Sequence, residues 1–392
     1  MKLNKVWFKW LAVNIARFLI ASIFLISGWS KAIDPMGMVY KLKSYTDYLG
    51  WPLTDENVFF KISVGILAVV ECYIGLNLFL GSRRKSTAIL AFLFMILMTV
   101  VTTFIYIYNP VQDCGCFGSV VELTHSETLL KNIVLLILSA FVMCYPRRMR
   151  RLITEKSQWI TSIYSTCYIF GLVLYSFYYS PLYSFTDYKI GVDLVSAYNG
   201  EGDDLKEDII NFSVSDSLGQ DMTPCVINDT SISFLLILPN IATADDSSAD
   251  EINDLYDYAI DHHYQFIALS ASSFTEYSSW QDRTGAMYPI YMTDESVLKT
   301  MGRSNPSLLL VMQGRIRGMW GKNELPSYLV HAPLEQQSVS TEKQSFASFI
   351  TDFFIFYFIP LLLIIFIDGL WVGNKIYRHR RYMRGLFSDS IK

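Results

Sequence analysis

The sequence carries little charge for its length. Of 392 residues only 17% are Asp, Glu, Lys or Arg, and the formal net charge is −4. Soluble domains carry about 25% charged residues, so the shortage argues against an ordinary cytosolic enzyme. Basic residues are not in excess, so nothing indicates a surface for nucleic acid. The 12 prolines and 21 glycines are too few for a fibrous or low-complexity chain.

Apolar residues are abundant instead, at 52% of the chain, and they are gathered in long runs. About 20 apolar helical residues cross the hydrocarbon core of a bilayer. Arg17 within the first run and the poor cleavage site at 30–32 favour a retained helix there over a cleaved signal peptide. We therefore predict six membrane helices, at Leu11–Ser30, Phe59–Leu80, Ser86–Tyr108, Leu129–Tyr145, Trp159–Ser180 and Phe346–Val372.

The basic residues predict how these helices are oriented. They fall in four clusters, at 2–9, 83–85, 147–151 and 375–384, and all four lie on one side if every run spans. The opposite loops, 31–58 and 109–128, are mixed or acidic. Because basic loops stay in the cytoplasm, we expect both termini there. We expect a multi-pass protein of a bacterial inner membrane, in contact with its lipid, with residues 185–345 in the periplasm.

Residues 185–345 differ in character, being rich in Asp, Ser, Asn and Thr. Strands alternate with helices there, which predicts an α/β domain with at least two parallel strands. The pattern predicts strands at Phe234–Leu238 and Gln265–Ser270, a helix at Ala249–His263, and a hairpin made of Ser307–Met312 and Arg315–Trp320. The chain thus divides into a four-helix membrane domain at 1–150, a fifth helix at 151–184, the α/β domain, and a sixth helix with a basic tail at 346–392.

The loop between the third and fourth helices holds the sequence Asp113-Cys114-Gly115-Cys116-Phe117-Gly118. A disulfide persists on the outer side of the membrane, and a ring between Cys114 and Cys116 would be strained and labile. Labile disulfides favour electron exchange with a lipid quinone or with thiols of another protein. The Asp113 charge disfavours a thiolate at Cys114, so Cys116 is the favoured attacking sulfur.

Other interpretations of these cysteines remain open. A purely structural disulfide between these two cysteines would stabilise the loop only weakly, because so short a ring removes little chain entropy. A metal site of Cys114, Cys116 and His125 has no evident fourth ligand. Cys225, in the outer domain, is either a third thiol that resolves the pair or a buried free thiol.

Two ionisable residues fall within the first two helices. Arg17 and Glu71 lie about 9 and 14 Å from the cytoplasmic side, so we predict an Arg17–Glu71 pair. The alternatives are a proton relay at Glu71 and an Arg17 that extends to the interface. Lys31 and Asp34 are expected at the outer rim near the cysteine loop, because Pro35 ends the first helix.

Residues 11–145 resemble the DoxX/MauE superfamily of four-helix membrane proteins. The MauE branch is linked to disulfide formation or reduction in exported proteins, and the bundle is similar to vitamin K epoxide reductase-type enzymes, whose cysteines are two residues apart rather than one. The resemblance implies a redox role for Cys114 and Cys116. It rests on Ser27, Gly28, Lys31, Asp34, Pro35, Glu71, Gly75, the run Cys114–Gly118, and Lys131-Asn132.

The outer domain resembles the thioredoxin-like fold of the TlpA and peroxiredoxin type. Pro306 occupies the place of the cis-proline that precedes the third core strand of that fold. The redox cysteines should follow Leu238, but residues 239–246 contain none. The domain is therefore expected to dock a partner or to cover the cysteine loop.

Two functions follow as hypotheses. The first is a membrane thiol–disulfide oxidoreductase that acts on exported proteins, with a quinone as the other end of the electron path. The second is a non-catalytic subunit that binds a partner within a membrane complex of the cell envelope.

Overall fold

The computed structural model describes residues 2–51, 53–54, 57–109, 118, 123–200, 209, 212–227, 231–334 and 351–389. It confirms a helical membrane region with six candidate spans and a mixed α/β sheet domain. The membrane helices are α1 (Lys2–Ile33), α3 (Val58–Leu80), α4 (Arg84–Tyr108), α5 (His125–Cys144), α6 (Gln158–Tyr178) and α14 (Ile359–Asp389), which follows a π-helical turn at Phe354–Phe358. The 3₁₀ turn Pro146–Arg148 follows α5.

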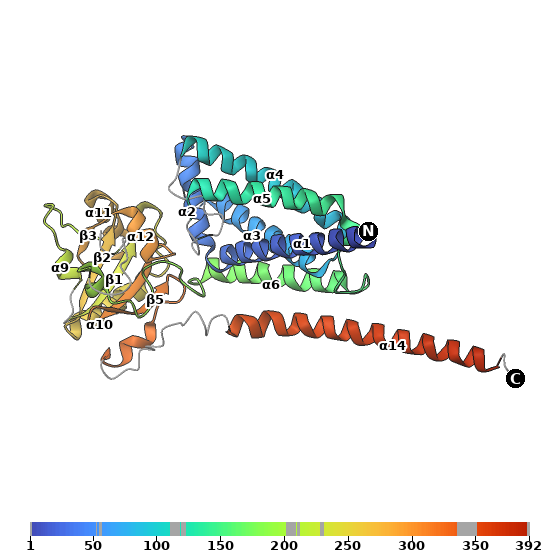
Figure 1. Cartoon of the computed structure of the whole chain (residues 1–392). Coiled ribbons are helices and arrows are strands. Elements are labelled where there is room, and N and C mark those ends of the chain that lie inside the picture. Colours follow the sequence, from blue (N-terminus) through green and yellow to red (C-terminus); the bar gives the residue numbers. More distant parts are fainter. Residues whose placement is uncertain are drawn as a thin grey trace.

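The first five membrane helices form one bundle, with the sheet domain at one end and the N-terminus at the other (Figure 1). Helix α14 runs along the α6 side, and its C-terminal end lies at the same end of the bundle as the N-terminus. Both termini therefore lie on the side of the bundle that faces away from the sheet domain.

Glycines allow α1 and α3 to pack closely. A Cβ atom at Gly28 would lie 2.8 Å from the backbone nitrogen of Cys72 and 2.5 Å from its sulfur. One at Gly75 would lie 2.9 Å from the backbone nitrogen of Leu25. Small residues let membrane helices approach at backbone distance, and this contact places the polar residues of the two helices opposite each other.

Polar contacts attach α14 to the turn that precedes α6. The Asp368 carboxylate accepts hydrogen bonds from the Thr154 N–H at 2.8 Å, the Thr154 hydroxyl at 2.6 Å and the Ser157 hydroxyl at 2.5 Å. Farther along, the Tyr357 hydroxyl bonds to that of Ser165 at 2.9 Å. An aspartate inside a membrane helix is costly unless it is satisfied, and these three donors satisfy it.

Helix α2 (Pro35–Tyr48) is an element that the sequence analysis does not predict. It lies at the end of the bundle that faces the sheet domain (Figure 1). Pro35 ends α1 and occupies the first turn of α2, where its missing N–H costs nothing. The Asp34 carboxylate accepts from the Gly37 N–H at 3.1 Å and caps the new helix.

The outer domain is built on a five-stranded sheet in the order β3-β2-β1-β4-β5. Strand β1 is parallel to β2 and antiparallel to β4, β2 is parallel to β3, and β4 is antiparallel to β5. The four strands predicted from the sequence are present, whereas short β3 was missed. The strands are β1 (Ile232–Leu238), β2 (Gln265–Ser270), β3 (Ile290–Met292), β4 (Ser307–Met312) and β5 (Arg315–Gly321).

Helices and short turns pack on both faces of this sheet. Along β1, Phe234, Leu236 and Leu238 point to one core, and Leu235 and Ile237 point to the other. The elements around it are α7 (Leu194–Tyr198), α9 (Thr223–Val226), α10 (Ala249–Asp261), α11 (Phe274–Thr284), α12 (Glu295–Met301) and the 3₁₀ turns Ile241–Thr243 and Ser327–His331. Because both faces are covered, the central strands β1 and β4 are almost entirely apolar.

Candidate functional site

Cys114 and Cys116 lie outside the described residues, but the structure places the end of their motif. Gly118 is buried, with a left-handed φ of 61°. Its carbonyl accepts a hydrogen bond from Lys41 Nζ on α2 at 3.1 Å. A Cβ at this position would lie 3.5 Å from the Ser30 hydroxyl oxygen, near the end of α1. The motif therefore ends where α1 and α2 meet.

His125 begins α5, directly after the described residues resume. Thr124 and Glu127 form a capping box around this end of the helix. Among the described residues no three His, Cys, Asp or Glu side chains gather into a metal site. The proposed ligand set of His125 with Cys114 and Cys116 cannot be placed, since both cysteines lie outside the described residues.

Lys31 and Glu71 form a buried ion pair between α1 and α3. Lys31 Nζ lies 2.9 and 3.2 Å from the two carboxylate oxygens of Glu71, and it donates to the Ser27 hydroxyl at 2.7 Å. The side chains are 0% and 4% exposed. The sequence predicts Lys31 at the outer rim, but its side chain is buried. It extends back along α1 towards Ser27.

The predicted Arg17–Glu71 pair is wrong. Arg17 is fully buried, and its Nη1 donates to the Arg150 carbonyl oxygen at 2.5 Å, beside Gly81. Gly81 is ten residues from Glu71, about 15 Å along a helix. The depth was misjudged because α1 begins at Lys2, so Arg17 is opposite the end of α3 rather than its middle. That Arg17 extends to the cytoplasmic interface stays a prediction.

A small cavity lies beside the ion pair, between α1, α3, α4 and α5. Its volume is about 30 Å³. It is lined by Ile23, Phe24, Ser27, Glu71, Phe94, Met95, Met98, Lys131, Asn132 and Leu135. At about 10–15 Å³ per water, it admits about two water molecules. This volume is too small for a quinone ring, so the cavity is not a quinone site, and a quinone partner stays a prediction.

The cavity also gathers a second cation. Lys131 lines it together with Glu71, and the neighbouring Asn132 amide donates to the Thr102 hydroxyl of α4 at 3.2 Å. Glu71 and Lys131 thus line a water-sized space, and Lys31 binds the same Glu71 carboxylate. Charged groups inside a membrane usually face such a space.

Part of the chain matches a known family. Residues 9–145 match the family described as Methylamine utilisation protein MauE. The match covers about a third of the chain and does not include α6 or α14. No curated protein and no solved structure matches the chain. The MauE match ends near the close of α5, so it says nothing about the sheet domain.

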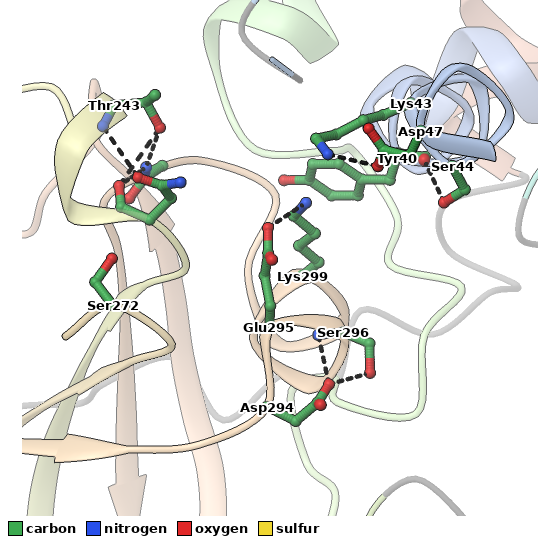
Figure 2. A network of polar contacts seen from close by, with 12 residues as sticks. Tyr40, Lys43, Ser44, Asp47, Thr243, Ser272, Asp294, Glu295, Ser296 and Lys299 are labelled. Carbon is green, nitrogen blue, oxygen red and sulfur yellow. Dashed lines mark hydrogen bonds and ion pairs between the residues drawn. The ribbon is translucent and has the colours of Figure 1, made fainter. Parts of the chain in front are cut away.

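Asp34 connects the region that matches MauE to the sheet domain. Its carboxylate lies 2.7 Å from Arg303 Nη2, and the two side chains are 1% and 11% exposed. Arg303 follows α12, and its guanidinium carbon lies 5.8 Å from the centre of the Tyr40 ring of α2. Figure 2 shows Lys299 of α12 beside the same ring, with Nζ 5.0 Å from its centre. Asp34 therefore caps α2 and also binds the sheet domain.

The sheet domain carries polar contacts at the end of β1. The Asn305–Pro306 peptide bond is cis and directly precedes β4. The Asn305 amide donates to the Asn240 carbonyl oxygen at 2.7 Å, and the Asn305 carbonyl accepts from the Asp245 N–H at 3.1 Å. Asp245 also pairs with Lys322. The turn after β1 is thus held to the Pro306 loop by hydrogen bonds and has no cysteine.

Cys225 lies on α9 of the sheet domain and is exposed, not buried. Its distance from Cys114 and Cys116 is not defined by the described residues, so its role as a third thiol stays a prediction.

Three residues of this site were missed or undervalued from the sequence. Lys41 and Arg303 had no local signal, because their partners are 77 and 269 positions away. Lys131 was noted only as part of the family resemblance. Charged residues that face one another on different helices can be recognised only when the packing of those helices is known.

Proposed function

We propose that the protein exchanges disulfide bonds with an exported thiol protein through Cys114 and Cys116. A partner thiolate attacks one sulfur of the oxidised pair, the bond between the two cysteines breaks, and a mixed disulfide forms. The partner's second thiolate then attacks that mixed disulfide and releases both cysteines as thiols. Two electrons and two protons pass from the partner's dithiol to the pair, and the reverse reaction reduces the partner.

The place of Gly118 is the observation that supports this function. Gly118 is the last residue of the Cys114–Gly118 run, and it lies beside Lys41 of α2 and Ser30 of α1. This is the end of the bundle that carries the sheet domain, opposite the basic residues of the loops. With basic loops in the cytoplasm, that end is in the oxidising compartment, which in a bacterial inner membrane is the periplasm.

We infer that the sheet domain is a thioredoxin-like module without redox cysteines. Strands β2, β1, β4 and β5 supply a central parallel pair followed by an antiparallel hairpin, and a cis-proline precedes β4. Hydrogen bonds from Asn305 occupy the turn where that fold would carry its cysteines. Such a domain can bind a protein segment without reacting with it.

The competing proposal is a non-catalytic subunit of a membrane complex. The turn after β1 favours this proposal. A sheet domain without cysteines at that turn could bind a partner protein but could not exchange disulfides with it there. In that case Cys114 and Cys116 would only shape the loop.

A trapping experiment in cells separates the two proposals. In the direction that reduces the partner, the Cys116 thiolate attacks the partner's disulfide and Cys114 resolves the mixed disulfide. Without Cys114 that mixed disulfide stays in place, so Cys114→Ser should yield a covalent adduct through Cys116 that is reducible on a gel. Cys116→Ser should yield none, and Cys225→Ser serves as the control for a third thiol. If neither single variant yields an adduct and the double serine variant keeps full function, the exchange proposal is wrong and the subunit proposal stands.

A further inference from the structure

The turn between α3 and α4, Gly81–Arg83, receives side chains from two other helices. It lies at the end of the bundle that carries the N-terminus (Figure 1). Arg17 of α1 reaches it from one side, with Nη1 2.5 Å from the position that a Cβ at Gly81 would occupy. Gln158 of α6 reaches it from another, and its side-chain oxygen accepts from the Arg83 N–H at 3.1 Å. Groups on α1, α4 and α6 therefore meet at this turn.

Arg17 is a buried cation at this turn. It is 0% exposed, and the charged groups among the described residues that act on it are Arg84 and Arg150, both positive. A buried charge inside a membrane bundle is costly unless it is paired. A negatively charged ligand would therefore stabilise this group more than any rearrangement of its positive neighbours.

The carboxylates of Glu155 and Asp368 lie at the same end of the bundle but bind other partners. Glu155 pairs with Arg151 on the loop before α6. Asp368 of α14 accepts hydrogen bonds from Thr154 and Ser157. Neither carboxylate pairs with Arg17, so these acidic groups do not balance its charge.

The hydrogen bonds of Arg17 indicate what kind of anion it can bind. Nη1 donates to the Arg150 carbonyl oxygen at 2.5 Å, whereas Nε and Nη2 have no hydrogen-bond partner among the described residues. Nε and Nη2 form one edge of the planar guanidinium, and such an edge binds two oxygens of a phosphate or a carboxylate at once. The Arg150 contact thus fixes the group and leaves its bidentate edge for a ligand.

Other buried polar groups of the described chain at this turn also have no partner. They are Nε of Arg84, the side-chain NH₂ of Gln158 and the hydroxyl of Ser82. Helix α4 begins after Arg83 without a side-chain cap, so its positive dipole end adds to them. Donors from α1, α4 and α6 suit the several oxygens of a phosphate better than the two of a carboxylate.

We propose that the α3–α4 turn binds a phosphate group through Arg17, Arg84 and Gln158. The bound group bridges α1, α4 and α6 at this end of the bundle. Its source is the headgroup of an anionic phospholipid or a free phosphate ion. Basic sites between membrane helices on the cytoplasmic side are typical places for anionic headgroups, and the basic loops predict the cytoplasm here. The inference is independent of disulfide exchange.

The test follows thermal unfolding of the full-length protein, delipidated in dodecyl maltoside, by its tryptophan fluorescence. Inorganic phosphate is titrated against sodium chloride and sodium acetate at equal ionic strength. Dioleoylphosphatidylglycerol is titrated against dioleoylglycerol, which has the same tails and no phosphate. A ligand that binds only the folded state raises the unfolding midpoint with its concentration, by about 3 °C or more at roughly a hundredfold excess over Kd.

The two titrations distinguish the source of the phosphate. A rise with the phospholipid alone identifies a headgroup, a rise with inorganic phosphate alone identifies a free ion, and a rise with both shows that the site recognises phosphate from either source. If neither raises the midpoint, or if acetate and dioleoylglycerol raise it as much, the proposal is wrong.

Three variants assign the effect to this turn. Gln158→Glu keeps the oxygen that accepts from the Arg83 N–H, and it replaces the unpartnered NH₂ by a negative charge. Its midpoint without ligand should exceed that of the wild type, and its Kd for the active ligand should rise about tenfold or more, as should that of Arg17→Gln. Arg151→Gln is the control, because it removes a charge at the same end from an arginine already paired with Glu155.

The control variant should keep Kd within about twofold of the wild type, since a difference of that size is well below one charged hydrogen bond. Gln158→Glu supplies its own negative charge at the turn, so the test does not depend on the folding of Arg17→Gln. If Gln158→Glu binds the ligand as tightly as the wild type, or if Arg151→Gln weakens binding as much, the phosphate does not bind at this turn and the proposal is wrong.

Discussion

Replacement of Glu71 and Lys31 by methionine, singly and together, tests the ion pair between α1 and α3. Glu71→Met removes the carboxylate that binds Lys31 and that lines the small cavity together with Lys131. Breaking a buried pair costs about 3–5 kcal/mol, and two remaining ammonium groups place this variant at the upper end. Lys31→Met leaves Lys131 near Glu71, so the loss of stability in this variant should lie at the lower end of that range.

The double variant gives the sharper result. Two methionines fill similar space without charge, so the double variant should be close to the wild type in stability, well below the sum of the single changes. The free energy of unfolding can be measured by titration with SDS in mixed micelles. Arg17→Met combined with Glu71→Met provides the control. It should be additive within about 0.5 kcal/mol, because the two sites are well separated. The Lys31–Glu71 pairing would be refuted if the destabilisation by Lys31→Met and Glu71→Met were additive. It would also be refuted if Arg17→Met and Glu71→Met were coupled as strongly.

Two other predictions concern packing and pH. Gly28→Ala should destabilise the bundle by about 1–3 kcal/mol, because its Cβ would overlap Cys72; Gly171→Ala, with open space around it, should be neutral or stabilising in the same unfolding assay. The hydrogen bond from Lys322 lowers the pKa of Asp245 to about 2, whereas an unfolded aspartate titrates near 4. The stability from this carboxylate is therefore complete above pH ~4 and is lost as pH falls towards 2. The stability difference between the wild type and Asp245→Asn should shrink over that range, and a constant difference would contradict the assignment.

The membrane helices could be predicted from the sequence because their signal is local. A run of about 20 apolar residues has one stable form in a bilayer, so Phe59–Leu80 was placed within one residue of α3. The strands of the sheet were equally local, since a short apolar run bounded by turn residues, such as Gln265–Ser270, is typical of a buried strand. Strand β3 was missed because three residues are too few to carry a pattern.

The partners of charged side chains could not be predicted in the same way. The pairing of Glu71 depended on where α1 begins, and the four turns before Arg17 shift its depth along the bundle. The surface helix α2 was missed for a related reason. Its apolar residues pack against α3, whereas Tyr40 lies beside Lys299 of the sheet domain, so its pattern depends on two distant parts of the chain.

The turn after β1 limits what the sheet domain can contribute to chemistry. Its backbone carbonyl at Asn240 is hydrogen-bonded to Asn305, and Asp245 is bound by Lys322. A domain with no sulfur at this turn can contribute surface and charge to a reaction with thiols, but no electrons from this edge. If the exchange proposal holds, the electrons must therefore pass through the loop that ends at Gly118.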